Sequence, residues 1–85
     1  MLGSNHPTAG WPYSGEIDIM EQRGNDKSYV EGTCHWYNTA GGNNASYGET
    51  ASIDTPSSEF HLYTVEWSES AVKIYLDDVK YYELP

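Results

Sequence analysis

The chain has few basic residues. Of its 85 residues only four are Lys or Arg, against thirteen Asp or Glu, which gives a formal net charge of −9. Because nucleic-acid phosphates bind to basic surfaces, this balance argues against nucleic acid as a partner. It also disfavours anionic membranes and strongly sulfated or carboxylated polymers. An uncharged ligand is compatible with it.

The chain also lacks the sequence features of disulfide-bonded, membrane-spanning and N-terminally targeted proteins. Cys34 is the single cysteine, so no internal disulfide can form, and such a cysteine is most often a small buried hydrophobic residue. No apolar run approaches the roughly 18 residues that a membrane span needs. Residues 1–6 contain neither the basic segment nor the apolar core of a signal peptide.

Phenylalanine is nearly absent, whereas other aromatic residues are abundant. The chain has one Phe but eight Tyr and three Trp. Tyr and Trp combine an apolar ring face with a polar tip, which suits stacking on sugar rings. Both residues are also common in β-strands, so the composition alone does not separate a binding role from a packing role.

The hydrophobic pattern is that of a β protein. In residues 71–76 apolar and polar side chains alternate with a period of two, and no segment has a helical period over a useful length. Short strands between turn signals predict an all-β fold, an antiparallel β-sandwich or barrel, with no second domain within residues 1–85. Residues 3–14 are expected to form a loop and residues 54–58 to separate two strands. The strands are expected at about 15–22, 28–38, 46–53, 60–67, 71–76 and 79–84.

Three carboxylates lie close together in the first of these strands. A strand places Glu16 and Asp18 on one face, whereas plain alternation would direct Glu21 to the opposite face. One bulge near residues 19–20 would add a residue and return Glu21 to the face of the other two. Such a cluster is costly to desolvate, so we expect it to serve acid/base chemistry or metal binding. Calcium is the less favoured interpretation, because its sites usually lie in flexible, glycine-containing loops. A solvated acidic strand edge is a further alternative.

This stretch resembles the active-site strand of glycoside hydrolase family 16. Residues 16–21 read Glu-Ile-Asp-Ile-Met-Glu, which is similar to the longer form of the motif in laminarinases, agarases and carrageenases. Trp-Pro at 11–12 stands before it as in the laminarinases. Gly-Thr-Cys-His-Trp at 32–36 and Phe-His-Leu-Tyr at 60–63 resemble two further family segments.

The resemblance implies a jelly-roll β-sandwich and an endo-1,3-β-glucanase that retains anomeric configuration. By position in the motif, Glu16 would be the nucleophile, Glu21 the general acid/base, and Asp18 a residue that hydrogen-bonds and tunes both. Mutual repulsion should raise at least one apparent pKa in this coupled set. The resemblance implies a secreted enzyme without a cofactor, acting on laminarin-like β-glucan first and on mixed-linkage glucan second.

Five other residues are candidates for substrate binding. By resemblance, Trp11 would wall the cleavage subsite, and His35 would face the cleft beside the carboxylates. Each could instead be a structural residue. Asn5 and Arg23 are possible sugar contacts, and Glu66 could face either the cleft or solvent.

Two alternatives to an active enzyme are compatible with the sequence. The family resembled includes glucan-recognition proteins whose catalytic carboxylates are replaced, so a glucan-binding module is one of them. Relative to the family's domain, the chain resembles a central piece that lacks strands at both ends. Exposed strand edges would then favour a homo-oligomer or an inactive, self-associating fragment.

Overall fold

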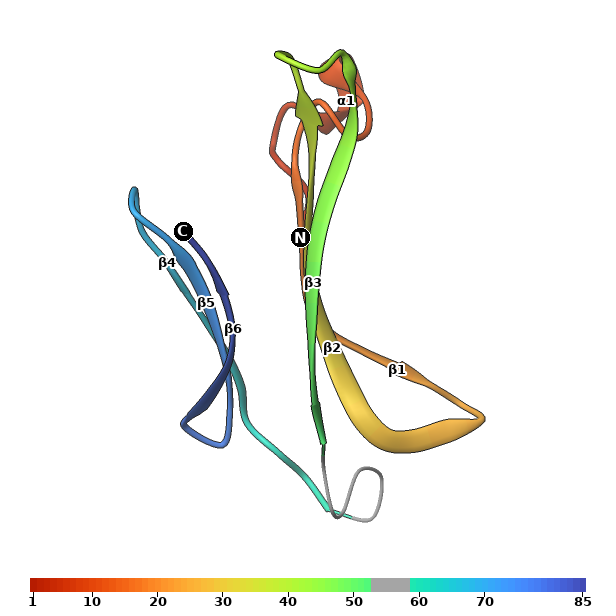
Figure 1. The fold of residues 1–85 in the computed structure, drawn as a ribbon, viewed down its shortest axis with the longest axis vertical. Helices are drawn as coiled ribbons and strands as arrows, with labels where there is room; N and C mark the ends of the chain where they lie inside the picture. Colours follow the sequence, from red (N-terminus) through yellow and green to blue (C-terminus); the bar gives the residue numbers. More distant parts are fainter. Residues whose placement is uncertain (53–58) are drawn as a thin grey trace.

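The computed structural model describes residues 1–52 and 59–85, and the predicted separator at 54–58 lies outside them. The described chain forms two three-stranded antiparallel sheets with strand orders β1-β2-β3 and β4-β5-β6 (Figure 1). This arrangement confirms the predicted all-β antiparallel fold. The elements are α1 (His6–Ala9), β1 (Glu16–Arg23), β2 (Asp26–Asn38), β3 (Asn43–Ser52), β4 (Tyr63–Trp67), β5 (Val72–Leu76) and β6 (Val79–Leu84).

The largest differences from the predicted boundaries occur in three segments. The predicted loop at 3–14 contains one helical turn, α1, where Pro7 occupies the first turn and so removes no intrahelical hydrogen bond. β3 begins at Asn43, three residues before the strand start expected at 46, because Asn43 pairs with Asn38 to close the hairpin. Residues 60–62 precede β4: the Leu62 amide donates to the Asp77 carboxylate (2.8 Å) instead of to a neighbouring strand.

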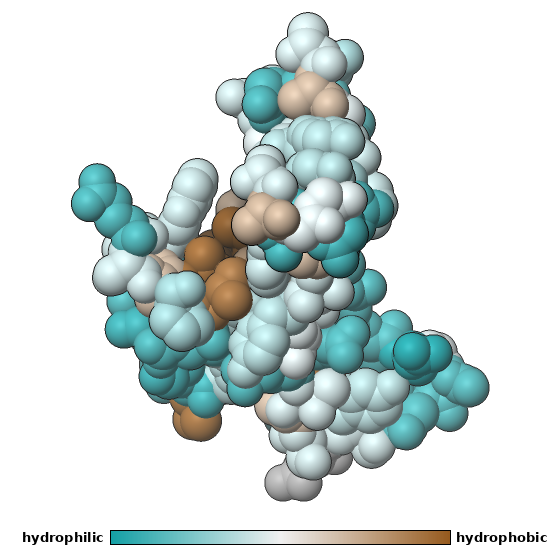
Figure 2. All heavy atoms as spheres, turned by 45° about the horizontal axis from the view of Figure 1, so that its top comes forward, coloured by the Kyte–Doolittle hydropathy of each residue, from teal (hydrophilic) through white to brown (hydrophobic). Residues whose placement is uncertain are grey.

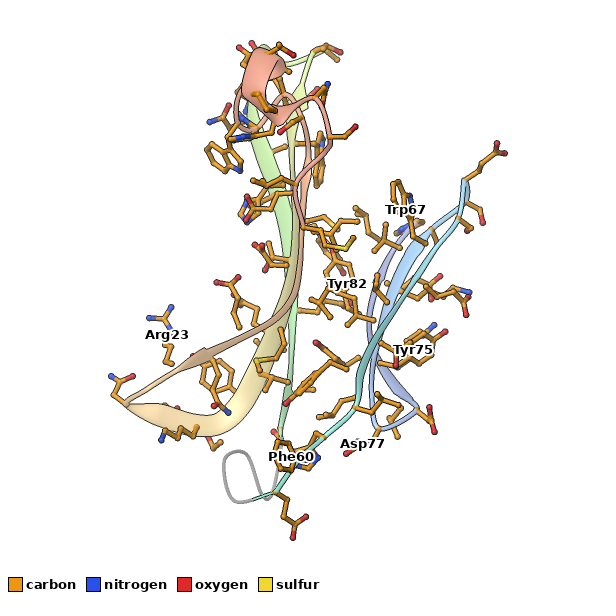
Figure 3. All side chains as sticks on the ribbon, turned by 180° about the vertical axis from the view of Figure 1, so that it is seen from behind. Arg23, Phe60, Trp67, Tyr75, Asp77 and Tyr82 are labelled. Atoms are coloured by element: carbon orange, nitrogen blue, oxygen red, sulfur yellow. The ribbon has the colours of Figure 1, made fainter. Side chains whose placement is uncertain are left out.

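The core lies between the two sheets. Cys34 of β2, Ile74 of β5 and Tyr82 of β6 are buried there, as Figure 3 shows for Tyr82. Figure 2 shows hydrophobic side chains gathered where the sheets meet. The residues packed around this cluster are Ile17, Ile19, Val65, Val72, Tyr81 and Leu84. Burial of Cys34 agrees with its expected structural role.

Hydrogen bonds also join the two sheets. The Tyr82 hydroxyl donates to the Tyr47 carbonyl (2.9 Å), and the Glu83 amide donates to the Glu49 carboxylate (3.1 Å). These contacts hold β6 against the inner face of β1-β2-β3. The second sheet therefore does not cover the outer face of β1-β2-β3. Among the described helices, none has the length and apolar character needed to cross a membrane.

Candidate active site

Alternation along β1 determines which of its side chains lie on the outer face of sheet β1-β2-β3. Ile17 and Ile19 pack on the core between the sheets. Successive side chains of a strand point to opposite faces, so Glu16 and Asp18 project from the outer face. The pairing with β2 places Glu16 opposite His35 and Asp18 opposite Thr33.

A bulge brings Glu21 to the same outer face. Between the pairs Asp18–Thr33 and Glu21–Glu31, β1 advances by three residues while β2 advances by two, so β1 carries one extra residue. Strand β2 pairs regularly with β3 through this region, and Glu31 and Thr33 therefore share a face. Glu21, as the partner of Glu31, lies on the face of Glu16 and Asp18. The irregularity is located where the sequence predicted it.

These carboxylates line one hollow of about 550 Å³ on the sheet surface. Its walls come from successive cross-strand rows of β1, β2 and β3. Four lining residues were not proposed from the sequence, although the period-two spacing of Glu31 and Thr33 with His35 could have identified two of them. The lining residues are Glu16, Asp18, Glu21, Glu31, Thr33, His35, Ser46 and Gly48.

The second sheet supports the bulge from behind. The Tyr81 hydroxyl of β6 donates a hydrogen bond to the Ile19 carbonyl, at the point where the regular ladder is interrupted. Gly32 makes room for this contact, since a Cβ there would lie 3.3 Å from Cε2 of Tyr81 and 2.9 Å from Cδ1 of Ile74. The conformation that orients Glu21 therefore depends on a tyrosine 62 residues away in sequence.

The electrostatics of the site centre on Glu16 and Asp18. A hydrogen bond to the Asp18 carboxyl is the largest cause of a raised pKa at Glu16, because two adjacent carboxyls share a proton. Burial and the negative charge of Asp18 also raise this pKa, whereas His35 and Trp11 lower it. Asp18 is in turn hydrogen-bonded to Nε2 of His35 at 3.1 Å. One raised pKa within the cluster agrees with the sequence-based expectation.

The same three side chains have a geometry that could accommodate a cation. One ligand atom from each of Glu16, Asp18 and His35 lies within 4.8 Å of the other two. Calcium, however, takes six to eight oxygen ligands, and this group offers one nitrogen and two carboxylates. The direct hydrogen bond between Asp18 and His35 already engages the nitrogen and the carboxylate oxygen that a metal ion would need as ligands. The arrangement fits shared protons better than calcium.

The other predicted binding residues lie in different surroundings. The Trp11 ring packs against His35 with centroids 5.7 Å apart, at the edge of the site. Arg23 lines a smaller adjoining hollow of about 130 Å³ together with Glu21 and Glu31. Asn5 caps α1, and its carbonyl accepts hydrogen bonds from the Thr8 and Ala9 amides.

Glu66 is not brought to the carboxylates. Its neighbour Val65 packs on the core, so Glu66 projects from the outer face of sheet β4-β5-β6 and is exposed. The carboxylate cluster projects from the outer face of the other sheet. Both sheets therefore separate Glu66 from the cluster. The sequence allowed Glu66 to face either the cleft or solvent, and in the structure it faces solvent.

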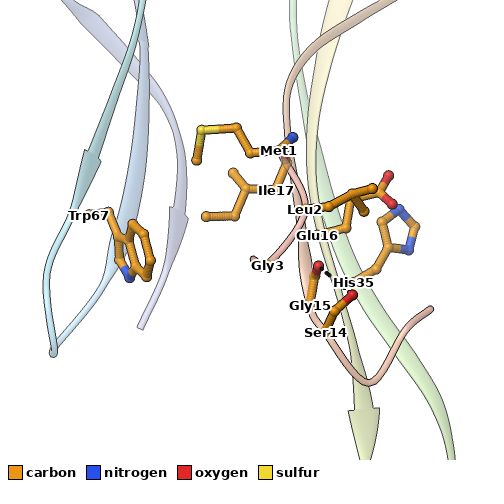
Figure 4. A pocket seen from close by; sticks show the side chains of 9 residues that line it. All are labelled: Met1, Leu2, Gly3, Ser14, Gly15, Glu16, Ile17, His35 and Trp67. Carbon is orange, nitrogen blue, oxygen red and sulfur yellow. Dashed lines mark hydrogen bonds between the residues drawn. The ribbon is translucent and has the colours of Figure 1, made fainter. Parts of the chain in front are cut away.

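The N-terminal residues complete the back of the site. The Met1 carbonyl accepts a hydrogen bond from the Ile17 amide (2.8 Å), and Leu2 bridges to Glu16, so this segment extends the sheet beyond β1. An apolar cavity of about 200 Å³ separates it from Trp67 of the second sheet. Figure 4 shows Met1 and Ile17 on the Trp67 side of the backbone and Glu16 with His35 on the other.

Comparisons with known proteins agree on one family. The model for "Glycosyl hydrolases family 16" matches residues 2–85. A glucan endo-1,3-beta-glucosidase from Cryptopygus antarcticus is 38% identical over 85 residues, covering 96% of this chain and 31% of that protein. A beta-1,3-glucan-binding protein from Penaeus monodon is 37% identical over 90 residues, covering 93% of this chain and 24% of that protein.

Solved structures agree with this result. A variant of LamA from Z. galactanivorans, in complex with laminaritriose and laminaritetraose, superposes with a TM-score of 0.90 at 37% identity. That match covers 98% of this chain and 38% of the solved chain. The chain spans 12% to 31% of the length of the curated relatives that it matches.

Proposed function

The chain belongs to glycosyl hydrolases family 16, and from this premise we propose that it carries the catalytic strand of an endo-acting β-1,3-glucanase that retains anomeric configuration. The observation that carries the proposal is the bulge in β1, which leaves Glu16, Asp18 and Glu21 lining one hollow. Residues 1–85 would be the central part of the catalytic domain. We expect the enzyme to act outside the cell, where glucan polymers are met.

The proposed reaction divides the work between two carboxyl groups. Glu21 gives its proton to the glycosidic oxygen while the Glu16 carboxylate attacks the anomeric carbon, which breaks the glycosidic bond and forms a glycosyl ester on Glu16. Glu21, now ionised, takes a proton from water, and the resulting hydroxide attacks the same carbon and releases Glu16. Asp18 holds Glu16 in place through the shared proton, and His35 orients Asp18.

Charge favours a neutral polysaccharide as substrate. Four carboxylates line the hollow (Glu16, Asp18, Glu21 and Glu31), and Arg23 is the single basic residue beside it among the described residues. A sulfated or carboxylated chain would be repelled, whereas an uncharged glucan would not. Laminarin-like β-1,3-glucan is the proposed substrate, followed by mixed-linkage β-1,3/1,4-glucan.

A second candidate function is glucan binding without hydrolysis. The 37%-identical protein from Penaeus monodon is named a beta-1,3-glucan-binding protein, so similarity at this level does not by itself select catalysis. The carboxylate cluster favours the enzyme, because a binding surface gains nothing from the cost of gathering like charges. Self-association of the isolated chain is a further proposal, since β3, β4 and β6 end their sheets with unpaired edges within the described residues.

We expect the protein, expressed from its complete coding sequence, to release reducing ends from laminarin and to produce the β-anomer first. The check is a reducing-sugar assay together with proton NMR of the earliest product. Initial α-anomer would contradict retention. Tight laminarin binding without product would favour the binding function.

We further expect the acidic limb of the kcat/KM profile to move to lower pH in Asp18→Asn. The pKa of Glu16 is raised mainly by the hydrogen bond to Asp18, and ionised Glu16 is the reactive form. Because this pKa is raised, Glu16 of the parent protein loses its ionised form at a relatively high pH as the pH falls. Asp18→Asn lacks the shared proton and the Asp18 charge, so in this variant the loss of ionised Glu16 begins at lower pH.

The measurement is kcat/KM on laminarin across the acidic range, because this ratio reports ionisation in the free enzyme. Asp78→Asn is the matched control, since Asp78 is exposed in the β5–β6 turn and asparagine tolerates its positive φ of 69°. An acidic limb that stays in place or moves to higher pH in Asp18→Asn would contradict the proposed tuning.

A further inference from the structure

An aromatic surface continues the carboxylate face beyond the catalytic rows. The pairing of β2 with β3 is regular from Glu31 to Asn38, so the face that carries Thr33 and His35 also carries Tyr37. Two residues along a strand span about 6.6 Å, which is comparable to the width of one sugar ring. Tyr37 therefore forms the row next to His35 and Glu16.

Tyr13 covers Tyr37 from the loop before β1. The two rings lie 4.4 Å apart between centroids with an interplanar angle of 31°, which is close to offset stacking. Tyr13 nevertheless remains 61% exposed, so the ring face turned away from Tyr37 is open to solvent. Trp11, in the same loop, is 47% exposed and packs against His35.

Turn geometry fixes this loop. The Ser14 amide donates to the Gly10 carbonyl (3.0 Å), and the Gly15 amide donates to the Pro12 carbonyl (2.9 Å). The Tyr13 ring is thus presented on a closed turn and backed by a second aromatic ring. A rigid, exposed aromatic face loses little conformational entropy when a ligand stacks on it.

We propose that Tyr13, backed by Tyr37, is the stacking surface for a glucosyl ring next to the ring held over Glu16. The proposal rests on the proposed glucanase function and extends it to substrate length. The apolar face of a β-linked glucosyl ring matches the exposed face of Tyr13, and the phenol hydroxyl is not required for this contact. Only glucans long enough to reach beyond the catalytic ring gain from it.

The test measures affinity and turnover separately, on protein expressed from its complete coding sequence. Calorimetry follows binding of laminarihexaose and of glucose, which has a single ring, to a Glu16→Gln background, with and without Tyr13→Ala. We expect Tyr13→Ala to weaken hexaose binding by about 3- to 10-fold and to change glucose binding by less than about 2-fold. Tyr13→Phe, the matched control, keeps the ring face and should bind like its parent.

Three outcomes decide between the two proposals. Length-dependent weakening in Tyr13→Ala, with the melting temperature kept, supports the stacking surface. Equal affinity with and without Tyr13→Ala, in a protein that cleaves laminarin, overturns the stacking surface and leaves the glucanase function standing. A protein that neither binds nor cleaves any β-glucan overturns the glucanase function, and the stacking surface with it.

Discussion

Replacing Glu16 by glutamine is expected to lower kcat on laminarin by roughly 10³-fold or more. Glutamine keeps the size of the side chain but has no carboxylate to attack the anomeric carbon, so the glycosyl ester cannot form. Glu16 is half-buried among polar neighbours, and a neutral amide there also relieves repulsion with Asp18. The fold should therefore survive, as the melting temperature and the circular dichroism spectrum can verify.

The matched control is Glu69→Gln, an exposed carboxylate in the turn between β4 and β5. This variant should keep its activity within about 2-fold, since surface substitutions away from specific contacts have small effects. A Glu16→Gln protein that retained more than a tenth of the parent turnover would remove Glu16 from the nucleophile role.

Replacing Glu21 by alanine is expected to lower turnover of laminarin by about 10²- to 10⁴-fold, the usual size of a general acid/base contribution. The loss should depend on the leaving group. In a 2,4-dinitrophenyl β-laminaribioside the leaving group, dinitrophenolate, departs without needing a proton. Formation of the glycosyl ester on Glu16 should therefore be nearly as fast as in the parent, and the ester should accumulate, with a burst of released dinitrophenolate.

Azide distinguishes the two carboxylates in this experiment. In Glu21→Ala, azide can attack the anomeric carbon of the ester, releasing Glu16 and forming the β-glycosyl azide. In Glu16→Ala, azide would attack the substrate directly, expel dinitrophenolate and form the α-glycosyl azide. NMR coupling constants identify the anomer. The α-azide from Glu21→Ala, or the β-azide from Glu16→Ala, would reverse the assigned roles.

Local pattern was sufficient to predict which strand carries the carboxylate cluster. The period of two places Glu16 and Asp18 together, and the extra apolar residue before Glu21 predicts the bulge that the register contains. The two-sheet antiparallel fold was predicted by the same periodicity. The start of β3 was predicted three residues late because asparagine is typical of turns, whereas pairing with β2 extends the hairpin over Asn43 and Asn44.

What the sequence could not supply depends on contacts between distant segments. The hydrogen bond from Tyr81 to Ile19 joins residues 62 positions apart, and nothing in the local pattern around Tyr81 indicates it. Glu66 has the same alternating surroundings as a cleft residue, and only its place in the second sheet sets it apart. The stacking of Tyr13 on Tyr37 likewise requires the loop before β1 to fold over β2.

The bulge in β1 also makes the strand tolerant of a change in length. Two residues of β1, Ile19 and Met20, stand opposite the single residue Gly32 of β2. A chain lacking one of them would continue the ladder without interruption, with the pairs on either side unchanged. One residue can therefore be gained or lost here during evolution without moving every later side chain to the opposite face of the sheet. Most positions in a paired strand do not tolerate such a change in length.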